Sequence, residues 1–183
     1  MIAPGLCPAF PTLPLSLPEE IAAMSLDSVR AFFAEKAPEI RIIELDTSTA
    51  TVALAAQAHG VEPGQIAKTL AFRVGEREIL VVARGDARID NRKMRAVFEA
   101  KAKMLDAETV LALTGHPVGG VCPFGLATPL PVYCDQSLRL YDEVLPAAGA
   151  THSAVRIAPQ RLAELVEGEW VDVCQLPEPA NGM

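Results

Sequence analysis

The longest stretch without a charged side chain runs from Thr109 to Cys134 and ends at the carboxylate of Asp135. Glycines and prolines interrupt it at a density that no membrane-spanning helix tolerates: Gly115, Gly119, Gly120, Gly125, Pro117, Pro123, Pro129 and Pro131. The run therefore predicts a buried loop system whose backbone is shaped by Gly and stiffened by Pro. Its central segment, residues 119–125, is a place where backbone N–H groups can come close to a small ligand.

The composition predicts one domain, or one domain with a tail, because the chain has 183 residues and half of them are apolar. Aromatic residues make up only 5%, so the core must be mainly aliphatic. The four cysteines contain no C-x-x-C pair, which argues against a zinc site or a disulfide framework and favours a reducing cytoplasm. The first basic residue is Arg30, so no secretory signal is expected.

The charge distribution is uneven. The net charge is −7, yet residues 68–103 carry ten Lys and Arg against five Asp and Glu. This asymmetry is typical of a phosphate-contacting face on an acidic body, although solvated strand and helix faces would give the same composition.

Turn and cap residues divide the chain into short elements. Closely spaced prolines predict an extended arm over residues 1–24, followed by a domain over 25–173 and a tail over 174–183. Helices are predicted after Ser25, from Ser48 or Thr49 to His59, and over residues 91–98, 107–113 and 159–166. Strands are predicted over 41–45, 66–74, 78–83, 131–134, 143–147, 154–157 and 170–173, with a hairpin turn at 75–76. This mixture favours an α+β (mixed α/β) fold.

Two charged residues stand at the ends of apolar strands. Lys68 begins the strand over 66–74, where an ammonium group needs an anionic partner or a ligand, unless it is a surface lysine at a strand end. Asp135 follows a buried strand. It can cap the helical segment after it, orient a substrate ammonium or a water molecule, or do both.

The glycine-rich loop offers two kinds of chemistry. Its N–H groups can face a developing oxyanion, or the loop is a tight structural turn; it lacks the ending of a phosphate-binding loop. Cys122 is a candidate nucleophile only if a histidine serves as its base, and His116 is the nearest one in the sequence. A cysteine hydrolase is therefore one alternative, with His116 otherwise a loop residue at the pocket entrance.

Five segments occur in an order and spacing that resemble one family. They are residues 65–70 (QIAKTL), 84–90 (RGDARID), 113–115 (LTG), 119–125 (GGVCPFG) and 131–138 (PVYCDQSL). Over residues 25–170 the chain resembles the YbaK/prolyl-tRNA-synthetase-associated editing domains, which are aminoacyl-tRNA deacylases.

The resemblance implies a compact single domain with a barrel-like mixed sheet flanked by helices. It also implies hydrolysis of the ester that joins a small wrong amino acid (Ala, Ser or Cys class) to tRNA, usually tRNA(Pro), without a metal or cofactor. The catalytic residues it implies are Lys68, Gly119, Gly120 and Asp135. Substrate contacts are expected at Thr69, His116, Val121, Cys122, Pro123 and Ser137, and tRNA contacts at Arg84, Arg88, Arg92 and Lys93.

The expected partners are a mischarged tRNA and, as a second candidate, prolyl-tRNA synthetase, in the cytoplasm and without a membrane. A non-catalytic module that binds tRNA or a synthetase is the alternative from a different class.

Overall fold

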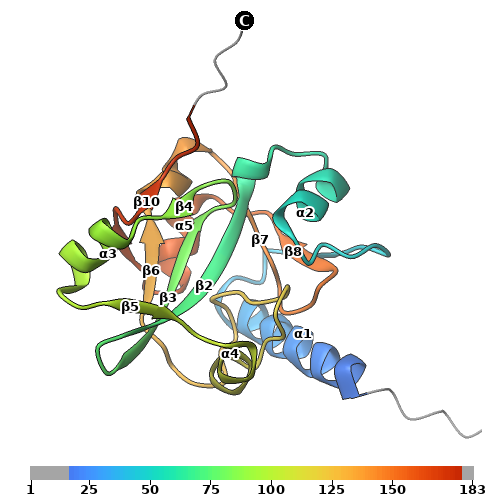
Figure 1. Cartoon of the computed structure of the whole chain (residues 1–183). Helices are drawn as coiled ribbons and strands as arrows, with labels where there is room; N and C mark the ends of the chain where they lie inside the picture. Colours follow the sequence, from blue (N-terminus) through green and yellow to red (C-terminus); the bar gives the residue numbers. More distant parts are fainter. Residues whose placement is uncertain (1–16, 179–183) are drawn as a thin grey trace, which may run out of the picture.

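The computed structural model describes residues 17–178 as a mixed sheet with helices around it (Figure 1). The helices are α1 (Leu17–Lys36), α2 (Val52–His59), α3 (Asn91–Phe98), α4 (Ala107–Thr114) and α5 (Pro159–Leu165), with the 3-10 turns η1 (Pro63–Gln65) and η2 (Gln136–Leu140). The longer strands are β2 (Ile66–Val74), β3 (Arg77–Arg84) and β6 (Val132–Asp135). The short strands are β1 (Ile42–Glu44), β4 (Arg88–Ile89), β5 (Ala102–Met104), β7 (Leu145–Pro146), β8 (Ser153–Val155), β9 (Glu169–Val171) and β10 (Cys174–Gln175).

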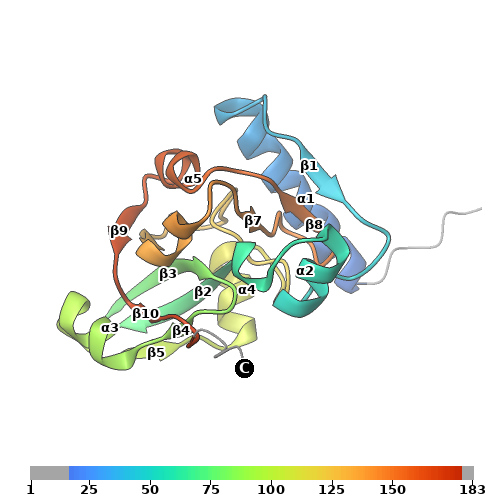
Figure 2. The same cartoon turned by 90° about the horizontal axis from the view of Figure 1, so that it is seen from above.

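The main sheet has the strand order β5-β2-β3-β6-β9, and β7 pairs with β2. The hairpin β2–β3 is antiparallel with Lys68 opposite Ala83, whereas β6 runs parallel to both β3 and β9. Two further pairs, β1–β8 and β10–β4, lie outside this sheet. Figure 2 shows α1 beside β1 and β8, at the opposite end of the molecule from α3 and β5.

Both faces of the sheet are buried, because alternate residues of each strand point to opposite sides. One face, with Leu80 and Val82, packs against Phe33 of α1, Phe124 of the glycine-rich loop and Leu162 of α5. The other face packs against Met94 of α3 and Val173 in a second cluster. The glycine-rich loop is therefore fixed between α1 and the sheet.

Local capping signals fix the ends of several elements. Asp90 accepts hydrogen bonds from the N–H groups of Arg92 and Lys93 at the start of α3, and Asp106 accepts one from Thr109 at the start of α4. Gly60 and Gly115 end α2 and α4 in the left-handed conformation. These caps and the β2–β3 hairpin confirm the predicted elements, except that Thr51 rather than Ser48 or Thr49 caps α2.

Both predicted chain ends are wrong in part, and the sheet is not a barrel. Helix α1 begins at Leu17 instead of after Ser25, since Pro18 lies in its first turn, where a helix tolerates proline. Residues 1–16 of the predicted arm and 179–183 of the predicted tail lie outside the described residues. Cys174 and Gln175, also placed in the tail, form β10 against β4. The main sheet stays open between its end strands β5 and β9 throughout the described chain, so the mixed α/β class is confirmed without closure.

Candidate active site

The outer edge of β2 is interrupted at its middle. Strand β7 pairs with Ile66 and Ala67 at one end of β2, and β5 pairs with residues 72–74 at the other end. No strand of the described chain pairs with residues 68–70 on this edge. The gap leaves the edge-facing main-chain groups of β2 without a strand partner at this point.

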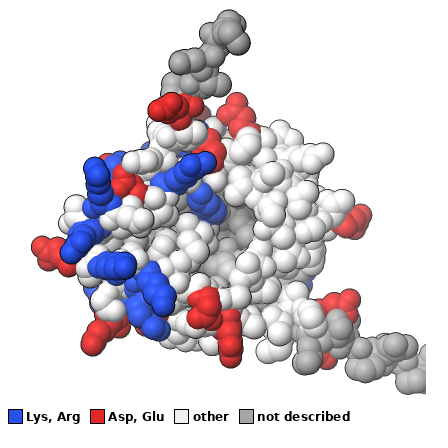
Figure 3. Space-filling model, viewed as in Figure 1, with Lys and Arg blue, Asp and Glu red and all other residues white. Residues whose placement is uncertain are grey.

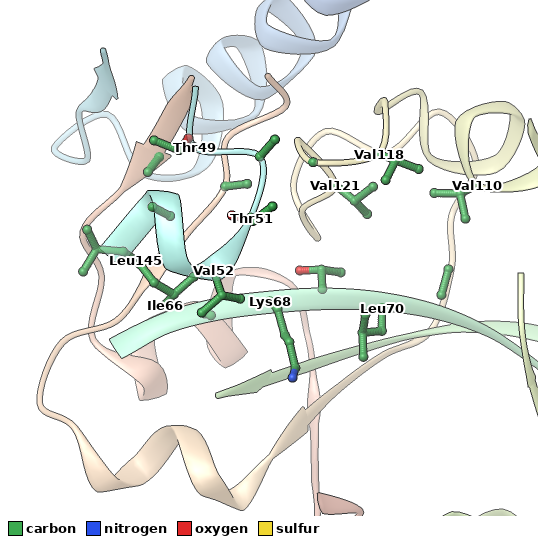
Figure 4. A pocket seen from close by; sticks show the side chains of 18 of the residues that line it. Thr49, Thr51, Val52, Ile66, Lys68, Leu70, Val110, Val118, Val121 and Leu145 are labelled. Atoms are coloured by element: carbon green, nitrogen blue, oxygen red, sulfur yellow. The ribbon is translucent and has the colours of Figure 1, made fainter. Parts of the chain in front are cut away.

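A cavity of about 520 Å³ fills this gap. Its walls are β2, helix α2, the start of α4 and the glycine-rich loop, as the labelled residues in Figure 4 show. Among the predicted site residues, Lys68, Thr69, Gly119 and Val121 line it. Gly120, His116, Cys122, Pro123, Asp135 and Ser137 do not belong to its lining. The volume falls in the range of small-molecule sites, about 300–1,000 Å³.

Thr69 presents three polar groups at the interrupted edge. The Leu105 N–H donates to the carbonyl of Ala71 (3.0 Å) across this edge. Because main-chain groups of alternate residues in an antiparallel strand point to the same side, the N–H and C=O of Thr69 point to the edge as well. The Thr69 hydroxyl oxygen is buried and has no hydrogen-bond partner among the described residues. Buried polar atoms without partners are rare, and binding sites are among the places where they occur.

The glycine-rich loop faces Thr69 from the opposite wall. Gly119 has a φ of 92°, and a Cβ there would lie 2.9 Å from the Cβ of Ala50, so this position requires glycine. The N–H groups of Gly119 and Val121 make no hydrogen bond within residues 17–178. The Gly120 N–H, in contrast, donates to the carbonyl of Pro117 (2.9 Å) and cannot serve an oxyanion. Within residues 119–125, Gly119 and Val121 are the residues that line the cavity, so their free N–H groups are the loop donors nearest to it.

The ammonium group of Lys68 lies on the far side of β2 from the loop residues Val118 and Val121 (Figure 4). Its Nζ donates to the carbonyl oxygens of Gly85 (3.0 Å) and Ala87. Burial lowers the pKa of Lys68, and the nearby Cys174 and Asp86 partly oppose this effect. An ammonium group has three donors, so one N–H of Lys68 remains for a ligand.

Asp135 and Ser137 have structural roles away from the cavity. Asp135 is 1% exposed, and its two oxygens accept hydrogen bonds from the N–H groups of Ser137 (2.9 Å) and Val173 (2.8 Å). The Ser137 hydroxyl accepts a hydrogen bond from the Arg84 N–H (3.4 Å). The capping role predicted for Asp135 is confirmed. A direct contact between its carboxylate and a substrate in the cavity is not part of this geometry.

His116 and Cys122 are also buried in the protein interior, outside the cavity lining. His116 Nδ1 lies 2.6 Å from the hydroxyl of Ser25 in α1, and its Nε2 lies 2.7 Å from the carbonyl of Phe124. Burial lowers the pKa of His116 and raises that of the Cys122 thiol to about 12. The thiol lies 3.6 Å from His116 Nε2, but it is fully buried and stays protonated. This environment argues against the cysteine-hydrolase alternative.

Basic side chains gather on one side of the molecule, beside a hollow in the surface (Figure 3). Of the predicted tRNA contacts, Arg84 binds Asp86 with two hydrogen bonds (2.6 and 2.7 Å), and Lys93 binds Asp172 (2.7 Å). Arg88 and Arg92 are exposed and form no ion pair within the described chain. Within residues 68–103, four further cations share both properties: Arg77, Arg95, Lys101 and Lys103.

Sequence reasoning missed the contribution of α2 to the cavity. Val52, Ala55 and His59 line it from one face of that helix. Their spacing of three and four residues is the signal that could have identified this stripe. Met104 and Val118 also line the cavity, and these residues are 56% and 62% exposed, which marks the open end.

These features define a small mixed α/β domain with a largely apolar ligand cavity at a broken sheet edge and a basic surface on one side. The comparison with known families is specific. Residues 46–165 match the aminoacyl-tRNA editing domain. The chain belongs to the family of aminoacyl-tRNA editing domains, which confirms the resemblance seen in the sequence. No described helix is long and apolar enough to cross a membrane.

Several relatives share this domain. The protein YwhH of Bacillus subtilis is 48% identical over 154 residues, which cover 83% of this chain and 98% of YwhH. Proline–tRNA ligase of Desulfovibrio desulfuricans is 32% identical over 98 residues, 53% of this chain but only 17% of the ligase. The crystal structure of a candidate trans-editing enzyme for prolyl-tRNA synthetase superposes with a TM-score of 0.78 at 34% identity, covering 82% of this chain and 97% of that one.

Proposed function

We propose that this protein is a trans-acting aminoacyl-tRNA deacylase, which hydrolyses the ester between a small misattached amino acid and tRNA, with tRNA(Pro) as the first candidate. Membership of the editing-domain family and the similarity to a trans-editing protein support the reaction class. The observation that carries the proposal is the set of unpaired polar groups around one cavity: the N–H groups of Gly119 and Val121, and the hydroxyl of Thr69.

The reaction needs little chemistry from side chains, since an aminoacyl ester is already activated. Water attacks the ester carbonyl, the bond to the ribose oxygen breaks, and the ribose oxygen takes up a proton. The N–H groups of Gly119 and Val121 stabilise the oxyanion that forms on the carbonyl oxygen. The Thr69 carbonyl and hydroxyl accept hydrogen bonds from the substrate ammonium, a role that the sequence had suggested for Asp135. Correct placement of ester and water supplies the rest of the acceleration.

Lys68 acts at the border between the cavity and the basic face. Its remaining N–H binds the ribose or the terminal phosphate, while its bonds to Gly85 and Ala87 hold the turn between β3 and β4. Exposed cations from the hairpin, β4, α3 and β5 then follow the acceptor stem through phosphate contacts, which gives salt-dependent binding with weak sequence preference.

A deacylation panel tests the proposal. The purified chain is incubated with tRNA(Pro) charged with Ala, Ser, Cys or Pro, and the release of the amino acid is followed. We expect release of at least one small amino acid, loss of activity in Lys68→Ala and Thr69→Val, and little change in the matched surface variant Lys36→Ala. Binding of tRNA without release from any member of the panel would favour the non-catalytic module instead.

A further inference from the structure

Two buried side-chain atoms in the described chain have no hydrogen-bond partner, and both belong to residues that line the cavity. They are the hydroxyl oxygen of Thr69 and Nε2 of His59. A buried polar atom without a partner costs about 1–3 kcal/mol, so such atoms persist where a ligand or water completes them. Thr69 already has a role in the proposed reaction, whereas His59 does not.

His59 lines the cavity as a half-buried residue whose Nε2 atom is buried. It is the last residue of α2, on the same helical face as Val52 and Ala55. The neighbouring walls are aliphatic and closed to solvent: Ala55, Ile66 and Leu145 are at most 8% exposed. In Figure 4 Ile66 and Leu145 lie at one end of the cavity, and Val118, a residue that is 62% exposed, lies at the other.

The two ends accept different parts of an aminoacyl-tRNA. A tRNA terminus is large and charged, so it must enter at the open end, near Met104 and the exposed Lys101 and Lys103. The amino-acid side chain then points to the enclosed end, where the walls are aliphatic and His59 Nε2 is a buried, unused polar atom.

The His59 ring is neutral under ordinary conditions. Burial and the nearby Arg156 both lower its pKa. A neutral imidazole offers either a donor or an acceptor at Nε2, depending on its tautomer, and so it matches a hydroxyl group, which is both. A carboxylate or an ammonium group would find no opposite charge on this ring.

We infer that His59 makes this cavity selective for a hydroxylated amino acid, serine or threonine, by a hydrogen bond from Nε2 to the β-hydroxyl group. The inference rests on the proposed deacylase function and narrows its substrate class. The aliphatic walls contact the methylene or methyl group of the substrate, and its hydroxyl group forms the hydrogen bond that His59 Nε2 lacks. Alanine fits the same space but leaves Nε2 unpaired, and sites that hydrogen-bond a substrate hydroxyl discriminate against analogues that lack it.

The test compares substrates that differ by one hydroxyl group. The specificity constant kcat/KM for deacylation is measured with Ser-tRNA against Ala-tRNA, and with Thr-tRNA against 2-aminobutyryl-tRNA, on the same tRNA. For the full chain we expect the hydroxylated member of each pair to react about tenfold faster or more, the value of one neutral hydrogen bond. In His59→Leu this ratio should fall towards one, because the rate with the hydroxylated member falls further than the rate with its partner.

Two variants make the result specific. His59→Gln keeps a polar terminal group and should restore part of the preference. His152→Leu is the matched control, since His152 lies outside this cavity, and it should keep both the rates and the ratio. A full chain that releases no amino acid at all would overturn the proposed function. A full chain that releases amino acids without a hydroxyl preference, or a His59→Leu variant with an unchanged ratio, would overturn the inference alone.

Discussion

Substitution of Asp135 tests whether this residue stabilises the fold or takes part in the chemistry of the cavity. Replacement by Ala removes the acceptor for two buried N–H groups, those of Ser137 and Val173. Each unsatisfied buried donor costs about 1–3 kcal/mol, so Asp135→Ala should lower the free energy of unfolding by about 2–6 kcal/mol. The free energy of unfolding of a typical domain is about 5–15 kcal/mol, and the variant should therefore be close to unfolding.

Asp135→Asn gives a graded version of the same change. The amide keeps one acceptor oxygen but replaces the other with an NH₂ group, which would face a main-chain N–H. The loss should be about half of that in Asp135→Ala, and it fits the same argument because only one of the two bonds survives.

Urea unfolding measures both variants. With a slope of about 2 kcal/mol per M, the midpoint of Asp135→Ala should fall by about 1–3 M relative to the original chain. Asp172→Ala is the matched control, since the Asp172 carboxylate is 64% exposed and pairs with Lys93 at the surface, and such pairs contribute at most about 1 kcal/mol. If Asp135→Ala kept its midpoint and lost only deacylation, the structural role would be refuted and a direct role in the chemistry restored.

Three further predictions follow from the same geometry. Burial lowers the pKa of His116 in the folded state, so its contribution to stability is complete above the unfolded pKa of about 6.5 and is lost as the pH falls. Between pH 8 and pH 5 the urea midpoint should therefore drop more for the original chain than for His116→Gln. Val121→Phe should fill part of the cavity and lower kcat/KM for deacylation, whereas Cys122→Ala should leave kcat/KM of the folded protein unchanged. Equal losses of kcat/KM in the two variants would contradict this prediction. The double variant Arg88→Ala with Arg92→Ala should weaken tRNA binding and reduce its salt dependence by about two phosphate contacts, which filter binding at several salt concentrations would show or exclude.

The sequence predicted best what local chemistry decides. The side chains of Asp90 and Asp106 start their helices, Gly60 and Gly115 end theirs, and Gly75 lies in the turn of the hairpin, each through contacts within a few residues. The predicted start of the first helix failed because the signals compete there. Pro18 is common in extended arms but is also accepted in a first helical turn, and Ser25, which resembles a cap, instead lies within α1.

The candidate site was predicted only in part, because its groups meet through long-range contacts. Lys68 and Thr69 are neighbours in the sequence, but which of them points its polar group to the cavity depends on the pairing of β2 with β5 and β7. The hydrogen bond between Ser25 and Gly149 joins residues 124 positions apart. The spacing of Val52, Ala55 and His59 marks one face of α2, but it does not say that this face covers the interrupted edge of β2.

The glycine-rich loop both packs into the protein interior and lines the cavity, because its successive residues have different surroundings. Gly119 and Val121 line the cavity, whereas Gly120 and Cys122 face the interior. A Cβ at Gly120 would lie 2.8 Å from the main chain of Gly149 and Ala150, so this position fixes the loop against the bend between β7 and β8. The close packing of Gly120 and Cys122 therefore holds their neighbours Gly119 and Val121 in place at the cavity wall. The free N–H groups of Gly119 and Val121 gain their fixed position from the packing of their neighbours, and this is the preorganisation that oxyanion stabilisation requires.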